Sequence, residues 1–192
     1  MPSRYWFVRH GESAANAEGW LAGHRDVALT PAGVAQAEAA AATLAPISPA
    51  RVVSSDLARA VHTAALAWGG RSPGVVAHAA VRERHLGEWE GRTIRSLRES
   101  GDMAALLSWE RGPPGGESHQ VLARRALGFL AAHDDGADTL LFGHGGWIRT
   151  VVGVLDGVPT GAIGAYKVGN TEVIERVVPR GRWQALLDAG LR

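Results

Sequence analysis

Apolar and polar positions follow each other along the chain in a pattern that predicts strands and helices in alternation. Short apolar runs between polar or glycine-rich segments predict buried strands at Tyr5–Val8, Arg51–Ser54, Val75–Ala77 and Thr139–Phe142. Longer stretches with helical spacing predict helices at Pro31–Leu44, Ser118–Ala132 and Trp147–Leu155, and a further helix that ends near Trp68. This alternation predicts the α/β class, as a three-layer α/β/α sandwich with a mostly parallel central sheet.

Residue types that cap helices mark two of the helix starts. Thr30 followed by Pro31 suits an N-cap and a first helical position, and Asp56 is expected to be the N-cap of the helix that ends near Trp68. The segment 93–110 predicts one or two helices broken near Gly101. Strand character is also present in three later runs, at Ala165–Val168, Val173–Val178 and Trp183–Leu187.

The length of 192 residues fits one domain. The alternation of strands and helices is interrupted at about residues 94–117. We therefore expect a single domain over residues 1–192, with a small helical cap inserted at about 94–117.

Composition removes several classes of protein. The absence of cysteine excludes a disulfide-stapled fold, cysteine-based zinc or iron–sulfur sites and a cysteine nucleophile. The formal net charge of +1 argues against a uniformly basic surface for nucleic acid or an anionic membrane, and charges or glycines interrupt the apolar stretches. We expect a soluble, cytoplasmic protein with no nucleic-acid or membrane partner, and its oligomeric state is left open.

Charged and histidine side chains follow three predicted strands at the point where each strand ends. Arg9 and His10 follow the first strand, Asp56 and Arg59 follow the second, and His144 follows the strand that begins at Thr139. Ligands of open parallel sheets bind outside the carboxyl ends of the strands, so we expect these side chains to meet in one crevice. Two arginines and two histidines beside helix N-termini make a site for a small dianion, of which phosphate is the commonest.

Six sequence blocks resemble, in order and over nearly the whole chain, those of the histidine phosphatase superfamily, also called the phosphoglycerate mutase-like family. The blocks are RHGES at 9–13 with Asn16 after it, LTPAG at 29–33, SSDLARAVHTA at 54–64, ERHLGEWEG at 83–91, PPGGES at 113–118 and GHGGWIR at 143–149. A single RHG is a weak signal, whereas six ordered blocks that fit the predicted elements are highly specific.

The resemblance implies a role for each candidate residue. His10 is implied as the nucleophile that becomes a phosphohistidine, and Glu83 as the acid that protonates the leaving alkoxide. Arg9, Arg59 and His144 are implied as ligands of the phosphate oxygens, so no metal or cofactor is expected. Further contacts with the substrate are expected from Gly11, Asn16, Ser118 and Gly145. The implied function is hydrolysis of a small phosphorylated metabolite, a phosphomonoester, without a metal.

Taken singly, each of these residues has a simpler explanation. A histidine after a strand is usually structural, and Glu83 beside Arg82 and Arg84 would usually form a surface ion pair. The ordered set favours catalysis. The remaining histidines are expected on the surface or behind the site: His24, His62, His78, His85, His119 and His133. Three tryptophans lie near the motifs and are candidates for the pocket wall: Trp20, Trp89 and Trp147.

Two other functions stay open: a phosphoglycerate-mutase-type phosphotransferase and a non-catalytic module that binds a phosphorylated ligand. The mutase branch of the family has a longer insertion between the acid and the second histidine, more basic residues, and a tyrosine where Leu86 stands. Here His144 follows Glu83 by 61 positions, and the single lysine, Lys167, lies far downstream. These features favour the phosphatase branch. The residues that can partly replace that charge are Arg92, Arg95 and Arg98, whose simplest placement is an exposed helix face.

Overall fold

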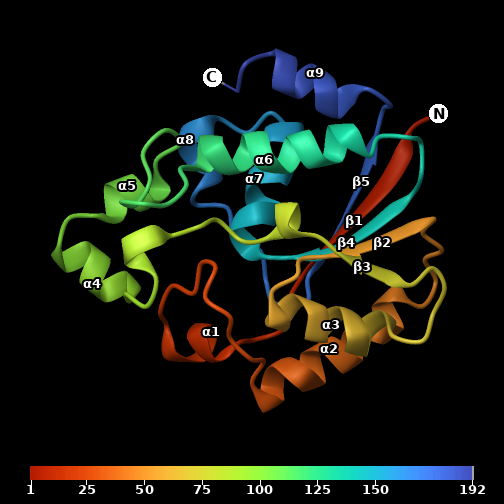
Figure 1. Ribbon diagram of the computed structural model, residues 1–192, viewed down its shortest axis with the longest axis horizontal. Helices are drawn as coiled ribbons and strands as arrows, with labels where there is room; N and C mark the ends of the chain where they lie inside the picture. The colour runs from red at the N-terminus through yellow and green to blue at the C-terminus, as the bar shows by residue number, and fades with distance from the viewer. Residues whose placement is uncertain (192) are drawn as a thin grey trace.

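A five-stranded sheet forms the middle layer of the computed structural model, which describes residues 1–191 (Figure 1). The strands are β1 (Ser3–Arg9), β2 (Arg51–Ser54), β3 (Val75–Ala77), β4 (Thr139–Gly143) and β5 (Val173–Val178). Their order across the sheet is β3-β2-β4-β1-β5, and only β5 runs antiparallel to its neighbour. The mostly parallel sheet of the prediction is confirmed.

Helices cover both faces of this sheet (Figure 1). On one side lie α2 (Pro31–Leu44) and α3 (Ala58–Trp68), and on the other lie α6 (His119–Ala132), α7 (Gly145–Leu155) and α9 (Arg182–Asp188). The shorter helices are α1 (Ala14–Glu18), α4 (Ile94–Glu99), α5 (Met103–Leu107) and α8 (Thr160–Ile163), with single 3₁₀ turns at Ala79–Val81 and Gly87–Trp89.

Alternate residues of the strands supply the two apolar cores. Tyr5, Phe7 and Leu141 pack with the α6, α7 and α9 side, whereas Val8 and Phe142 pack with α2 and α3. A strand that is buried on both faces has a continuous apolar run, which is why the YWFV and TLLF segments lack polar alternation. The three-layer α/β/α sandwich is therefore confirmed.

Most predicted elements are confirmed. Strands β1 to β4 and helices α2 and α6 lie where the sequence pattern places them, and Thr30 and Ser118 each accept a hydrogen bond from the backbone of the first turn. The segment after Thr93 forms two helices separated by Gly101. Helix α7 begins at Gly145, two residues before the predicted start.

Three local predictions are wrong. Asp56 is not the N-cap of α3, because its carboxylate binds Arg82 and Leu57 occupies the cap position. The segment 165–168 forms no strand, since the carbonyl of Val168 accepts from the side chain of Arg9 instead. The run at 183–187 is helical within α9, where Trp183 packs edge-on against Tyr5 at 5.3 Å between ring centroids.

The strand order brings the three predicted junctions together. Strands β2, β4 and β1 are parallel neighbours, with Arg9 opposite Gly143 and Ser54 opposite Phe142. Their carboxyl ends therefore lie at one edge of the sheet, on the side of the segment that carries α4 and α5. This segment has its own small apolar cluster, formed by Leu86, Trp89, Leu97 and Leu106.

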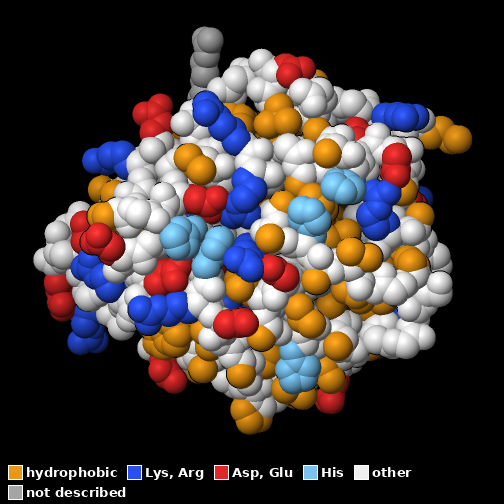
Figure 2. Space-filling view, viewed as in Figure 1, with side chains coloured by type: hydrophobic (Ala, Val, Ile, Leu, Met, Phe, Trp, Pro, Cys, Tyr) orange, Lys and Arg blue, Asp and Glu red, His pale blue; other side chains and the backbone are white. Residues whose placement is uncertain are grey.

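The surface agrees with the near-neutral charge of the chain. Basic and acidic side chains are interspersed over the face shown in Figure 2, and neither sign forms a continuous area there. Among residues 1–191, every helix is too short or too polar to cross a bilayer.

Candidate active site

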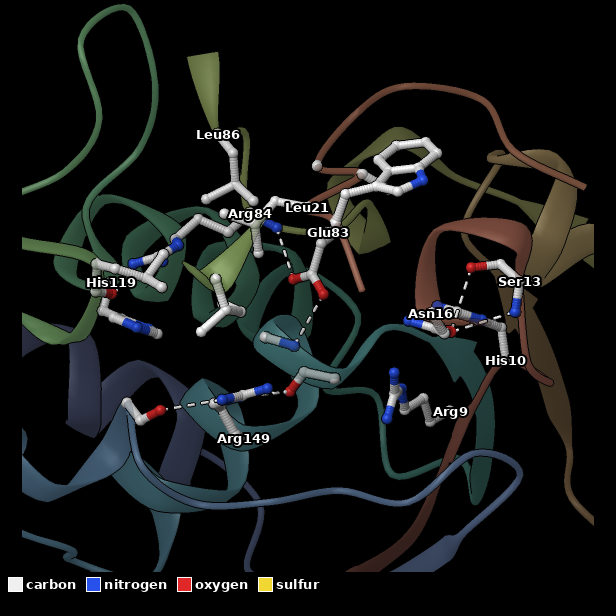
Figure 3. Close-up of a pocket in the computed structure, with 18 of the residues that line it drawn as sticks. Arg9, His10, Ser13, Asn16, Leu21, Glu83, Arg84, Leu86, His119 and Arg149 are labelled. Atoms are coloured by element: carbon white, nitrogen blue, oxygen red, sulfur yellow. Dashed lines mark hydrogen bonds between the residues drawn. The ribbon is translucent and has the colours of Figure 1, made fainter. Parts of the chain in front are cut away.

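A cavity of about 280 Å³ opens where β1 and β4 end, and the segment with α4 and α5 forms its far wall. Six of the nine predicted site residues line it: Arg9, His10, Asn16, Arg59, Glu83 and Gly145. The ring of His144 lies 5.1 Å from the ring of His10, edge to face. The structure thus brings together side chains that lie far apart in the sequence, of which Figure 3 labels Arg9, His10, Asn16 and Glu83.

His10 directly follows β1 and is only 4% exposed. Its Nδ1 lies 2.6 Å from the carbonyl oxygen of Gly11. A carbonyl oxygen only accepts hydrogen bonds, so Nδ1 carries the proton and Nε2 keeps its lone pair. Burial, together with the positive charges of Arg59 and Arg9, holds the pKa of His10 well below its ordinary value. The imidazole is therefore neutral at physiological pH and suited to nucleophilic attack through Nε2.

His144 is the residue before α7 and is fully buried. Neither of its ring nitrogens has a hydrogen-bond partner within the described chain. A buried polar group without a partner costs free energy, and such groups are common where a ligand completes the site. Burial, followed by the charge of Arg59, holds the pKa of His144 well below its usual range. The neutral ring has one N–H to donate to an anion beside His10.

The two predicted arginines are held by backbone carbonyls. Nη1 of Arg9 donates to Val168 at 2.7 Å, and its buried Nε has no partner among residues 1–191. Nη1 and Nη2 of Arg59 donate to the carbonyls of Arg25 and Gly23 at 2.9 and 2.8 Å. Burial lowers the pKa of both side chains. Each terminal nitrogen of a guanidinium has two hydrogens, so these bonds fix the groups and leave donors for an anion.

Glu83 lies in the cavity at the N-terminus of α7. Its Oε2 accepts from the backbone of Gly146 at 2.9 Å, and its Oε1 accepts from Trp147 at 3.1 Å and from Arg84 at 2.7 Å. The positive end of the helix and three N–H donors hold the carboxylate in one position. The simpler explanation of Glu83 as a surface ion pair with Arg82 or Arg84 does not hold, because Glu83 contacts the backbone of Arg84 and Arg82 binds Asp56.

Two predicted substrate contacts do not line the cavity. The amide of Gly11 donates to Thr63 Oγ1 at 3.0 Å, and Ser118 caps α6 through Val121. A glycine is required at position 11 because a Cβ there would lie 2.4 Å from the carbonyl oxygen of Gly33. Asn16 lies at the rim, where its Oδ1 accepts from Ser13.

Of the three candidate tryptophans, only Trp20 lines the cavity. Trp89 is buried in the small cluster beneath α4, and Trp147 is buried in the main core, where its Nε1 donates to Ala80.

Sequence reasoning missed four polar residues of the cavity: Ser13, Arg84, His119 and Arg149. All four lie inside or next to the matched blocks, which is the only signal that the sequence offers for them. His119 was expected on the surface or behind the site, yet it is 3% exposed and lines the cavity. Burial lowers the pKa of His119 to about 3, so this ring is neutral at physiological pH.

Known proteins with similar sequences and structures include several phosphatases. An adenosylcobalamin/alpha-ribazole phosphatase of Salmonella typhimurium is 32% identical over 86% of this chain and 85% of its own length. A glucosyl-3-phosphoglycerate phosphatase of Mycolicibacterium vanbaalenii is 36% identical over 81% of this chain and 75% of its own. Relatives named as 2,3-bisphosphoglycerate-dependent phosphoglycerate mutases also match.

The structure of a mycobacterial glucosyl-3-phosphoglycerate phosphatase in complex with VO3 superposes on this chain with a TM-score of 0.82. The superposition covers 90% of each chain at 29% sequence identity. The profile of the Histidine phosphatase superfamily (branch 1) matches residues 5–188, which include every residue of the cavity named above. The chain therefore belongs to branch 1 of the histidine phosphatase superfamily.

Proposed function

We propose that this protein is a phosphomonoester hydrolase that works through a phosphohistidine on His10. The observation that carries the proposal is the state of the His10 ring, whose Nδ1 is bound to Gly11 and whose Nε2 lone pair is available beside two arginines. The phosphatase names of the relatives support the same activity.

In the first step, the lone pair of His10 Nε2 forms a bond to phosphorus while the bond from phosphorus to the ester oxygen breaks. The departing alkoxide takes a proton from the carboxyl group of Glu83. Arg9, Arg59 and His144 donate hydrogen bonds to the non-bridging oxygens, whose negative charge persists through the transition state.

In the second step, water attacks the phosphorus atom of the phosphohistidine. The carboxylate of Glu83 takes a proton from this water, and the bond from phosphorus to Nε2 breaks. Inorganic phosphate leaves, and both His10 and Glu83 return to their starting protonation states. All charge compensation in these steps comes from side chains of the chain itself.

The cavity suits a small substrate. Its volume of about 280 Å³ is near the lower end for small-molecule sites, and Ile94, Met103, Leu106 and Leu107 form part of its wall. We therefore keep the proposal of a single domain in which the segment at about 94–117 acts as a cap over the substrate. A cytoplasmic location, without nucleic-acid or membrane partners, remains a prediction.

A panel of alkyl and aryl phosphomonoesters, assayed for phosphate release with EDTA present, tests the activity. We expect release to persist under chelation, and a brief incubation with labelled substrate to give an acid-labile, base-stable phosphoprotein. The His10→Ala variant should fold and carry no label. Label on a serine, label retained in His10→Ala, or activity restored only by a metal would contradict the mechanism.

A phosphotransferase of the mutase type is the second candidate, and two observations favour it. Relatives with that name match the chain, and Arg84 and Arg149 place additional cations in the cavity. A non-catalytic binding module is less favoured, because the nucleophile, the acid and all three phosphate ligands are present.

A further inference from the structure

The loop before β5 carries a side chain that contacts two segments of the candidate site. This side chain is Asn170, which none of the six sequence blocks includes. Its Nδ2 donates to the carbonyl oxygen of His10 at 2.9 Å and to Oδ1 of Asn16 at 3.3 Å. The chain contains two asparagines, Asn16 and Asn170, so the two bind each other.

Hydrogen-bond partners fix the orientation of both amide groups. The carbonyl oxygen of His10 only accepts hydrogen bonds, so the atom of Asn170 that faces it is the nitrogen. The backbone nitrogen of Ser13 only donates, so the atom of Asn16 that lies 3.2 Å from it is the oxygen. Exchanging oxygen and nitrogen in either amide would place two donors or two acceptors against each other.

The oxygen of Asn16 has three donors around it. The backbone nitrogen and the hydroxyl of Ser13 each lie 3.2 Å away, as the dashed lines in Figure 3 mark, and Nδ2 of Asn170 lies at 3.3 Å. All hydrogen bonds of the Asn16 side chain within residues 1–191 thus go to its oxygen. Because Asn16 lines the cavity, the two N–H groups of its Nδ2 remain for a ligand there.

The turn that carries Asn170 has an unfavourable backbone conformation. Thr171 has a φ of 54°, in the left-handed region that β-branched residues rarely adopt. Its backbone nitrogen donates to the carbonyl of Arg9 at 3.0 Å, and the backbone nitrogen of Arg9 donates to Glu172 at 3.3 Å. These bonds hold the turn against the end of β1. Strained residues of this kind cluster at functional sites, where the surrounding structure keeps them in place.

We infer that Asn170 is a positioning residue, which orients the amide of Asn16 so that Nδ2 of Asn16 donates to a phosphate at His10. The carbonyl of His10 takes one hydrogen of the Asn170 amide and thereby directs the other to Asn16. Asn170 is not part of the cavity wall, so it acts through Asn16. Donors that are already oriented stabilise negative charge without reorganising. The inference rests on the proposed function, which places a phosphate at His10.

A double-mutant cycle tests this assignment. Asn16→Ala removes the donor, Asn170→Ala removes the group that orients it, and a third variant carries both changes. We expect Asn170→Ala alone to weaken the binding of inorganic phosphate and to lower kcat/KM by about tenfold, the contribution of one hydrogen bond. In the Asn16→Ala background the same change should alter both values by less than about twofold, because no amide is left to orient. Equal losses in the two backgrounds, or no loss in Asn170→Ala, contradict the inference.

A matched control removes an amide elsewhere. Gln184 is exposed on α9 and donates to Asp188, so Gln184→Ala should leave phosphate binding and kcat/KM unchanged. Circular dichroism checks that each variant folds. If Asn170→Ala does not fold, Asn170→Ser takes its place in the cycle, since the serine hydroxyl ends one bond short of Nδ2 and does not reach Asn16. A loss in Gln184→Ala as large as that in the Asn170 variant would contradict a specific role for Asn170.

The binding of inorganic phosphate needs no turnover, so it separates this inference from the proposed function. Calorimetry measures it on the wild-type protein and on the three variants of the cycle. If the wild-type protein releases phosphate from no ester but the loss of binding in Asn170→Ala depends on Asn16, the proposed function fails and the positioning role stands. If esters are hydrolysed but the losses in the two backgrounds are equal, the hydrolase stands and the positioning role is wrong.

Discussion

At the scale of single residues, the direction of one hydrogen bond decides which nitrogen of His10 attacks phosphorus in the proposed mechanism. The carbonyl of Gly11 accepts the proton on Nδ1, at 2.6 Å, and leaves the lone pair on Nε2. We therefore predict phosphorylation at Nε2 only. Nuclear magnetic resonance of the phosphoenzyme labelled with ¹⁵N-histidine distinguishes the two isomers, and a phosphate on Nδ1 would show that the ring has the opposite tautomer.

Glu83 allows a second prediction at this scale. An alkoxide is a poor leaving group and needs a proton, whereas a nitrophenolate leaves without one, so Glu83→Gln should slow the first step far more for alkyl than for aryl phosphates. General acids contribute about 10²- to 10⁴-fold, and we expect a difference within that range. Single-turnover kinetics of the phosphorylation step measure it. Equal losses on both kinds of ester would remove Glu83 from the acid role.

The sequence predicts the proposed catalytic residues better than the residues at the opposite end of the cavity. Arg9, His10 and His144 end or follow neighbouring strands, so the strand order alone brings them together. Arg84 and His119 reach the cavity because the segment with α4 and α5 folds over them, and no local pattern encodes that contact. A histidine directly after an N-cap serine can face either side of its helix until the neighbouring segments are known.

At the scale of elements, two glycines allow the backbone of α2 to pack closely against the loop after β1. A Cβ on Gly33 would lie 2.0 Å from the carbonyl oxygen of Glu12, and a Cβ on Gly11 would lie 2.4 Å from the carbonyl oxygen of Gly33. The same loop carries His10, so this backbone contact positions the proposed nucleophile. It also explains why glycines stand in both the RHGES and LTPAG blocks.

Replacing Gly33 with alanine should therefore destabilise the protein by about 1–3 kcal/mol, the usual cost of overpacking between rigid backbones. Gly128→Ala is the matched control, because Gly128 lies within α6 and a Cβ there has nothing within 4 Å. This control should instead gain about 0.5–1 kcal/mol from better helix propensity. Urea unfolding measures both changes. A Gly33→Ala variant as stable as the wild type would show that the two backbone segments can move apart at little cost in free energy.

Element prediction succeeds where the decisive signals are local. Thr30 and Ser118 begin α2 and α6 as expected, because a cap depends on a side chain and a backbone three residues apart. Element prediction fails where a contact with a residue far along the chain determines the local structure. Asp56 binds Arg82 instead of capping α3, and Trp183 joins a helix because its ring packs against Tyr5. A short apolar run such as 183–187 does not by itself distinguish a strand from a helix.

At the scale of the whole molecule, three buried histidines link stability to pH. The pKa values of His10, His119 and His144 lie below their ordinary value because the rings are buried, and that of His119 falls to about 3. Below about pH 6.5 these histidines bind protons in the unfolded chain, whereas the buried rings of the folded chain stay neutral. The contribution of the three neutral rings to the free energy of unfolding is therefore fully present above that pH. It is lost as the pH falls toward their folded-state pKa values.

We predict that the free energy of unfolding decreases as the pH falls from 6.5 to 4.5, and that His119 contributes about 1.4 kcal/mol per pH unit to this decrease. Urea unfolding over this range gives the slope. His119→Gln should remove one histidine's share of it, whereas His62→Gln, at an exposed position, should leave the slope unchanged. A stability that stays flat across the range would mean that the rings are protonated in the folded state.

The balance between hydrolase and mutase also belongs to this scale, because it depends on whether the cavity keeps water from the phosphohistidine. A mutase holds a bisphosphorylated intermediate in a closed site. Here Arg92 is paired with Asp102, Arg95 and Arg98 are exposed, and none of the three lines the cavity. Arg84 and Arg149 do line the cavity, but backbone carbonyls hold one nitrogen of Arg84 and two of Arg149, so few of their donors remain for a second phosphate.

We therefore predict steady release of phosphate from 3-phosphoglycerate and negligible conversion to 2-phosphoglycerate, even when 2,3-bisphosphoglycerate is added. The physical reason is that the chain between Glu83 and α6 places only the short helices α4 and α5 over the cavity, so water reaches the phosphohistidine before a second substrate oxygen does. Parallel assays of both products on one reaction mixture measure the two rates. Interconversion that outpaces hydrolysis would move this protein to the mutase branch.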